Sequence, residues 1–268
     1  MNKTFRHYML ATLLLAAPLG AAAREQNDTI APQHHEESTT LLKAALKGVH
    51  VELRAGVLIG GTSPMPLPRE IRSIESYNPT LCTSFEGAVQ KSFEQSPWGV
   101  KLGVRLETKG MRTQARVKNY HMEMTADDGG YMVGAWTGHV TTKVRNTNLT
   151  FPVLATYSLG ERWTLSAGPY LSWMFDGEFS GSAFDGYLRH TDPTGDKAEV
   201  SRASYDFSDD LRHFEWGAQV GAQWRAYKHL AVYADLEWGF NNIFPSDFQS
   251  VTFALYPIYA NVGFTYIF

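Results

Sequence analysis

Apolar and polar side chains alternate one by one in several stretches of this chain, most regularly between residues 212 and 226. Apolar side chains occupy every second position there, and polar or small side chains stand between them. A period of two places successive side chains on opposite faces of a β-strand, so the stretch predicts a strand with one apolar face. The apolar members are Phe214, Trp216, Ala218, Val220, Ala222 and Trp224.

The same alternation predicts eight strands, and the connections between them are alternately long and short. With both ends of the strand region on the periplasmic side, each short turn is periplasmic and each long connection is an extracellular loop. We therefore predict an all-β fold, an eight-stranded antiparallel transmembrane β-barrel of the outer-membrane type. The predicted strands are 49–60, 81–93, 98–111, 139–158, 163–175, 212–226, 230–240 and 257–268, and the predicted long loops are 61–80, 112–138, 176–211 and 241–255.

Charged residues alternate with the apolar ones, which predicts an apolar face toward lipid and a polar face toward a lumen. A water-soluble barrel would show the reverse arrangement, with apolar residues inside. A charge enclosed in such a lumen is costly without a partner, so we expect cross-strand ion pairs. The predicted lumen charges are Glu52, Arg54, Glu86, Lys101, Arg105, Glu107, Lys109, Glu215, Arg225, Asp235 and Glu237. A narrow or gated ion path through the same residues is the alternative, and paired carboxylates acting as a hydrolase site are a weaker one.

Aromatic residues gather at both ends of the predicted lipid-facing side. Two such girdles, eight to ten residues apart, fit a tilted strand that crosses the hydrocarbon layer. The girdle beside the short turns contains Phe93, Trp98, Tyr157, Trp163, Trp224 and Phe268, and the girdle at the other end contains Trp173, Phe175, Phe214, Trp216, Trp238 and Phe240.

The last predicted strand carries a spaced set of residues, Asn261, Gly263, Tyr266 and the terminal Phe268. This spacing resembles the C-terminal assembly signal of bacterial outer-membrane barrels. The resemblance implies that the strand engages the barrel-assembly machinery. The alternation itself predicts that this strand closes the barrel against residues 49–60.

The N-terminus has the pattern of a secretory signal peptide over residues 1–23. Lys3 and Arg6 form its positive region, residues 9–19 its apolar core, and Ala23 the last residue before cleavage. Residues 24–48 are predicted to form a periplasmic segment with a short helix over 38–47, and residues 49–268 the barrel. We therefore expect a protein that is exported to the bacterial outer membrane and surrounded by its lipid.

Composition and charge exclude a few other classes of protein. The 268 residues have a net charge of −3, so no basic excess points to nucleic acid. No run of about 20 apolar residues follows position 23, so the sequence does not predict a membrane-spanning helix there. The single cysteine, Cys82, excludes an intramolecular disulfide.

Two short segments, residues 148–154 (NLTFPVL) and 167–171 (AGPYL), resemble the outer-membrane β-barrel proteins of Bacteroidota typified by PorT. In that family a proline-containing strand, a short turn and a Gly-Pro-Tyr strand follow in this order. The resemblance extends over about residues 49–268 and implies a barrel. PorT is associated with type IX secretion, but the resemblance does not imply secretion, so a component of an export system is kept as an alternative role.

The expected role is a non-enzymatic structural or binding scaffold, because side chains fill a barrel of eight strands and its loops stand on a rigid support. Tyr131, Trp136, Phe184 and Tyr187 are candidate contact residues for a protein or glycan partner. A lipid-A deacylase or acyltransferase using His139 near the outer leaflet is the enzymatic alternative. The pattern assigns no catalytic, cofactor or metal site.

Overall fold

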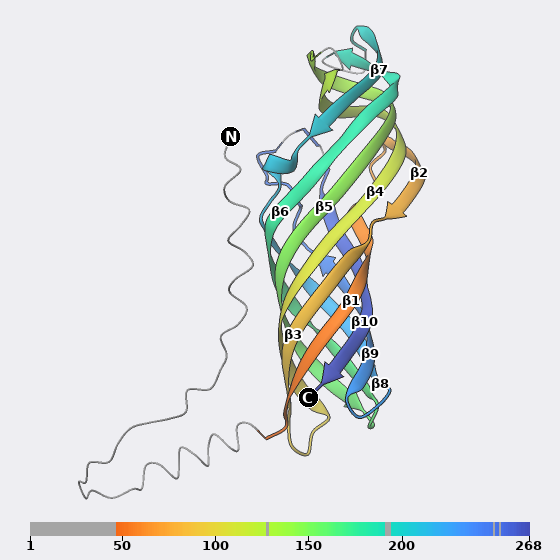
Figure 1. The fold of residues 1–268 in the computed structure, drawn as a ribbon. Coiled ribbons are helices and arrows are strands. Elements are labelled where there is room, and N and C mark those ends of the chain that lie inside the picture. The colour runs from red at the N-terminus through yellow and green to blue at the C-terminus, as the bar shows by residue number, and fades with distance from the viewer. Residues whose placement is uncertain (1–46, 127–128, 191–193, 249, 252) are drawn as a thin grey trace, which may run out of the picture. The chain divides into compact units, whose positions relative to one another are not determined.

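The structure is a computed structural model, and it describes residues 47–126, 129–190, 194–248, 250–251 and 253–268 (Figure 1). The predicted signal peptide, 1–23, lies outside these residues. So does the predicted periplasmic segment with its helix, apart from Lys47 and Gly48. In the described part of the chain, no helix is long and apolar enough to cross a membrane.

Ten strands and one short 3-10 helix make up the described chain. The helix η1 is Ser208–Asp210. The strands are β1 Val49–Pro64, β2 Ile71–Pro79, β3 Cys82–Ser92, β4 Trp98–Ala126, β5 Tyr131–Leu159, β6 Trp163–His190, β7 Lys197–Asp206, β8 Phe214–Arg225, β9 Leu230–Gly239 and β10 Leu255–Ile267.

Eight of these strands close into an antiparallel ring, which confirms the predicted barrel. The order around the ring is β1, β3, β4, β5, β6, β8, β9 and β10, and β10 pairs with β1 again. Leu53 stands opposite Tyr266 and Leu58 opposite Asn261, so the last strand closes the barrel on the first as predicted. The closed ring leaves no free sheet edge where it crosses the bilayer, as a barrel in lipid requires.

Apolar side chains point outward from this ring and polar side chains point inward. Leu53, Val220 and Leu236 are 53%, 50% and 48% exposed, whereas Arg105 and Thr265 are fully buried. An exposed apolar belt of this extent is stable in lipid and unstable in water.

Three strands of the ring run far beyond the membrane span. β4 and β5 have 29 residues each and β6 has 28, whereas about 9–11 residues cross a bilayer. Figure 1 shows these three strands continuing past the ends of β1, β3, β8, β9 and β10. We call this continuation, with β2 and β7, the β extension.

The β extension corrects the predicted loops. Residues 112–138 and 176–211 are mostly strand, and β2 lies within the predicted loop 61–80. β2 pairs with β4, and β7 pairs with β6 and with the end of β4. Only the fourth predicted loop, 241–255, is irregular over nearly all of its described residues.

These strands were predicted as loops because their apolar residues change from the outward face to the inward face along the strand. On β5, Phe151 and Val153 point outward, whereas farther along the strand the apolar Val140 and Val144 point inward and Lys143 points outward. The β extension is thus apolar inside and polar outside, as a sheet in water is. On β6 a register shift accompanies this reversal, because Thr147 pairs with Asp176 and Asn148 with Met174. One extra residue exchanges the two faces of a strand.

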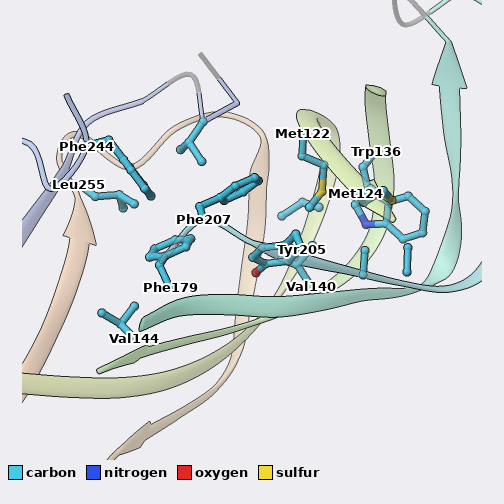
Figure 2. Close-up of a cluster of buried hydrophobic side chains, with 14 of the residues drawn as sticks. Met122, Met124, Trp136, Val140, Val144, Phe179, Tyr205, Phe207, Phe244 and Leu255 are labelled. Atoms are coloured by element: carbon cyan, nitrogen blue, oxygen red, sulfur yellow. The ribbon is translucent and has the colours of Figure 1, made fainter. Parts of the chain in front are cut away.

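An apolar core fills the inside of the β extension (Figure 2). Trp136 is its largest member and is fully buried. Rings of Phe179, Phe207 and Phe244 contact one another, with centroids 5.0 Å apart for Phe179 and Phe244. Burial raises the pKa of Tyr205, whose neutral hydroxyl donates to the Thr141 carbonyl at 2.9 Å. The β extension is therefore a packed unit rather than a set of loops.

We expect Gly186→Ala to loosen this core. A Cβ at position 186 would lie 2.7 Å from both the Trp136 ring and the Gly138 Cα. Overpacking of this kind destabilises by about 1–3 kcal/mol. Limited proteolysis should therefore cut the β extension of the variant faster than that of the wild type.

Gly87→Ala is the matched control for this prediction. Its added Cβ would have Leu53 as its nearest neighbour at 4.0 Å, so we expect wild-type cleavage. Equal cleavage rates for wild type and Gly186→Ala would contradict the close packing of the Trp136 ring against Gly138 and Gly186.

Candidate functional site

The lumen of the ring contains a buried ion-pair layer with Arg105 of β4 at its centre. The guanidinium lies 2.9 Å from Glu107, 2.8 Å from Glu237 and 3.4 Å from Glu86. Its Nη2 also donates to the Gln219 Oε1 at 2.9 Å. These partners stand on four different strands, so Arg105 cross-links the barrel from within.

Arg54 of β1 forms the second centre of this layer. Its Nη1 donates to Glu86 at 3.1 Å, and its Nη2 donates to Asp235 at 2.7 Å. The guanidinium also lies over the Tyr233 ring, 3.7 Å from its centroid. A planar, always charged guanidinium suits such a site, because it binds two carboxylates and stacks on a ring at once.

Two lysines complete the layer. Lys109 lies 3.2 Å from Glu107, 3.1 Å from Glu215 and 3.5 Å from Glu237. Lys101 lies 2.7 Å from Glu52. Tyr170 donates its hydroxyl to Glu215 at 2.6 Å.

The structure thus brings together nearly all of the predicted lumen charges. The exception is Arg225, which corrects the prediction: it is exposed at the end of β8 and makes no ion pair with any described residue. Its position in the alternation is that of a lumen residue, but the strand ends there and the side chain is exposed. The layer consists of Arg54, Lys101, Arg105, Lys109, Glu52, Glu86, Glu107, Glu215, Asp235 and Glu237.

The apolar core of the β extension follows directly beyond the ion-pair layer. On β4 the two are adjacent, since Lys109 belongs to the layer and Met111 to the core. A cavity of about 20 Å³ lies between them, lined by Asn148, Glu215 and Met174 among others, and has about the size of one water molecule. The described residues therefore fill the barrel with a charged layer and an apolar layer in series.

The predicted girdle residues lie on the outside of the ring. At one end Trp98 packs edge-on against Tyr157, with centroids 4.9 Å apart, and Trp163 contacts Trp224 at 6.5 Å. The exposed aromatic side chains of the two girdles include Phe93, Trp98, Trp163, Trp173, Trp216, Trp224, Trp238 and Phe268. Paired aromatics with one polar edge suit the boundary between lipid and water.

The residues of the proposed assembly signal divide between the two faces of β10. Tyr266 and Phe268 point outward and contact each other edge-on at 4.9 Å. Asn261 points inward and accepts a hydrogen bond from Ser84 at 3.0 Å. Gly263 lies against the backbone of β1, where a side chain would meet the Gly56 Cα at 2.5 Å.

The candidate enzyme residue His139 lies on the outer face of the β extension. Its Nδ1 is 2.9 Å from Glu75 of β2, and its ring stacks on Phe184 with centroids 5.5 Å apart. It stands ten residues beyond Leu149 of the apolar belt, so it lies well outside the lipid layer where a lipid-A deacylase would use it. Among the described residues, no three His, Cys, Asp or Glu side chains are placed to hold a metal ion.

The predicted contact aromatics have different environments. Trp136 is a core residue, so its assignment as a contact residue is wrong. Phe184 stacks on His139, and Tyr187 lies beneath the cations of Arg189 and Lys197. Tyr131 remains exposed, at 67%, near the end of the β extension.

The sequence interpretation missed a basic cluster on the outer face of the β extension. Arg112 of β4 stands directly opposite Lys143 of β5, and Arg145 follows two residues later on the same face. These positions fall in predicted loop 112–138 and at the start of a predicted strand, so only the register of β4 with β5 brings them together.

Comparison with known families gives one match over most of the chain. The model of the family described as "Outer membrane protein beta-barrel domain" matches residues 26–245. No curated protein sequence matches the chain.

Several solved structures of outer-membrane barrels are similar at low sequence identity. Ail of Yersinia pestis, in complex with the heparin analogue sucrose octasulfate, is 10% identical, with 82% of this chain and 97% of that chain covered and a TM-score of 0.35. Neisserial surface protein A is 9% identical, with 83% and 98% covered and a TM-score of 0.32. The outer-membrane protease OmpT of Escherichia coli is 12% identical, with 83% and 97% covered and a TM-score of 0.34.

Proposed function

This chain belongs to the outer membrane β-barrel protein family and is located in the outer membrane, and from this premise we propose that it is a non-catalytic binding scaffold. In this proposal the barrel is a sealed anchor. The β extension is a rigid extracellular surface for a protein or glycan partner.

The observation that carries the proposal is the combination of a filled lumen with a packed β extension. Arg105 and Lys109 are buried, and the apolar core continues from the ion-pair layer. A filled lumen argues against a conducting pore, because ions need a continuous polar path. A β extension with its own core costs conformational entropy to order, and a membrane anchor alone does not require it.

The remaining parts of the proposal concern how the protein reaches the membrane. We propose export through a cleaved signal peptide at residues 1–23, followed by insertion through recognition of Tyr266 and Phe268 by the barrel-assembly machinery. The resemblance to PorT-type proteins of Bacteroidota supports this route. It also keeps a role in type IX-like export as the second candidate.

A truncated barrel tests the scaffold proposal. Val117 pairs with Gly138, and Ala183 pairs with Ala203, so a two-residue Asn-Gly turn can replace 118–137 and another can replace 184–202. We expect the truncated protein to insert and to keep a heat-dependent shift on gels. Photo-crosslinking in intact cells from a probe at position 74, which is exposed on β2 and kept in both proteins, should capture a surface partner with the full-length protein and lose it with the truncated one.

Equal crosslinking by both proteins would contradict the scaffold proposal. A changed profile of secreted proteins in a deletion strain, restored by the truncated barrel, would favour the export role instead. Altered lipid A in that strain would favour the enzymatic alternative. Discrete conductance steps of the purified protein in planar bilayers would favour the gated channel.

A further inference from the structure

We propose that the outer face of the β extension contains a binding site for the phosphorylated headgroup of an outer-leaflet glycolipid, formed by Arg112, Lys143 and Arg145. This inference is independent of the protein or glycan partner proposed above. It rests on the charge, height and surroundings of these three side chains.

The first observation is an arrangement of like charges. Arg112 and Lys143 are directly opposite in the β4–β5 register, and Arg145 stands opposite Gly110, two residues along the same face. Like charges opposite each other destabilise a sheet. Arg112 and Arg145 make no ion pair with any described residue, so an external anion would relieve their repulsion.

The neighbouring acidic groups offset only part of the charge of this cluster. Glu178 of β6 stands directly opposite Arg145 in the β5–β6 register. Glu178 is bound to Lys143 at 2.8 Å and also accepts from Ser180 at 3.0 Å. The hydrogen bond from Lys143 lowers the pKa of Glu178, which therefore stays charged at neutral pH. Asp206 binds the Ser208 backbone N–H at 3.0 Å and its hydroxyl at 2.5 Å. Two carboxylates thus have partners, while two guanidinium groups remain available.

The second observation is the height of the cluster above the lipid. Leu149 of β5 is level with Trp173 of the girdle, because the two residues are paired. Arg145 lies four residues beyond Leu149, which is about 13 Å along a strand. With the usual tilt of barrel strands, this is about 10 Å above the apolar belt. A long arginine side chain can reach back toward the headgroup region from there.

The third observation is the surface beside the cations. A groove of about 580 Å³ is lined by residues of β4, β5, β6 and β7, with Arg112 and Lys143 as its cations and Asp206 as its one carboxylate among the described lining residues. Its other lining residues include hydroxyls on neighbouring strands, among them Thr141, Ser180, Ser182 and Ser204. Cations beside a row of hydroxyl groups complement a phosphorylated sugar, which offers phosphate oxygens and ring hydroxyls. Among the lining residues, the pair Lys143 and Ser180 lies nearer the apolar belt than the pair Thr141 and Ser182. The cationic end of the groove therefore faces the headgroup region, so a lipid-anchored sugar is the occupant that the position favours.

Native mass spectrometry of the detergent-purified protein titrated with bis-phosphorylated lipid A tests this proposal. The double variant Arg112→Gln with Arg145→Gln should bind about 30-fold more weakly than the wild type, given the usual contribution of a basic residue at an anionic membrane surface. The matched control, Arg225→Gln with Lys228→Gln, removes the same charge at the opposite end of the barrel and should bind within about twofold of the wild type. All three proteins should show the same heat-dependent gel shift, which establishes that they are folded.

Three results would overturn the proposal. Equal binding of lipid A and of its dephosphorylated form would show that only acyl chains are recognised. Equal weakening in both double variants would show a general effect of charge. In the third result, the double variant would lose binding of dextran sulfate but keep binding of lipid A. Arg112 and Arg145 would then form a site for a soluble polyanion instead.

Discussion

Replacing Arg105 with alanine is expected to lower the free energy of unfolding by about 3–5 kcal/mol, the largest effect of any single substitution considered for this protein. Arg105 is fully buried and contacts Glu86, Glu107 and Glu237. The variant leaves these carboxylates in the lumen with fewer cations. Removing one partner of a buried pair costs more than the pair itself contributes, because the remaining charge stays desolvated. Urea unfolding in lipid vesicles, followed by tryptophan fluorescence, measures the change.

Arg225→Ala is the matched control for this experiment. It removes the same side chain from the exposed end of β8, where no described residue pairs with it. We expect a change within about 0.5 kcal/mol. If Arg105→Ala unfolded at the same urea concentration as Arg225→Ala, the ion-pair layer would not be a structural element of the barrel.

Leu236→Lys is expected to destabilise the inserted protein by about 2–4 kcal/mol. Leu236 is 48% exposed on the outer face of β9 and is paired with Ala260 of β10 and with Val220 of β8. Val220 lies four residues from each of the girdle residues Trp216 and Trp224 on β8. A lysine there must place its ammonium group in hydrocarbon or distort the bilayer to reach water. The same unfolding experiment in vesicles gives the value.

Ile74→Lys provides the comparison for Leu236→Lys. Ile74 of β2 is 60% exposed, but it lies in the β extension beyond the apolar belt. A lysine is solvated there, so we expect a change of less than about 0.5 kcal/mol. A neutral result at position 236, or equal losses at the two positions, would mean that lipid does not cover the outer face of β9.

The membrane-spanning half of the fold could be predicted because the bilayer imposes one simple rule on every strand. Large apolar side chains such as Trp216 and Leu236 must alternate with inward polar ones, and the closed ring follows from the number of such strands. The β extension obeys the opposite rule. Its inward positions include small or hydroxylated residues such as Thr113, Thr142 and Gly181, which interrupt the alternation.

The candidate site was predictable in its composition but not in its pairing. Ten charged residues could be assigned to the lumen from their polar positions in the alternation alone. That Arg105 contacts Glu237, 132 positions away, follows only from the order of strands around the ring. The alternation also assigned Arg225 to the lumen, because the pattern contains no information about where the strand ends. The pairing of Arg112 with Lys143 required the register of β4 with β5, and Arg112 had been interpreted as part of a loop.

Spin labels along β6 test the central claim most directly, namely that the first half of a long strand crosses lipid and the second half projects into water. Single labels are placed from position 163 to 184 in a Cys82→Ser background, and their accessibility to oxygen and to a water-soluble nickel chelate is measured in vesicles. We expect oxygen access at alternate outward positions such as 171 and 173, and nickel access at outward positions such as 180 and 182. Oxygen-dominated alternation that continued to position 184, or no alternation between 163 and 175, would contradict the claim.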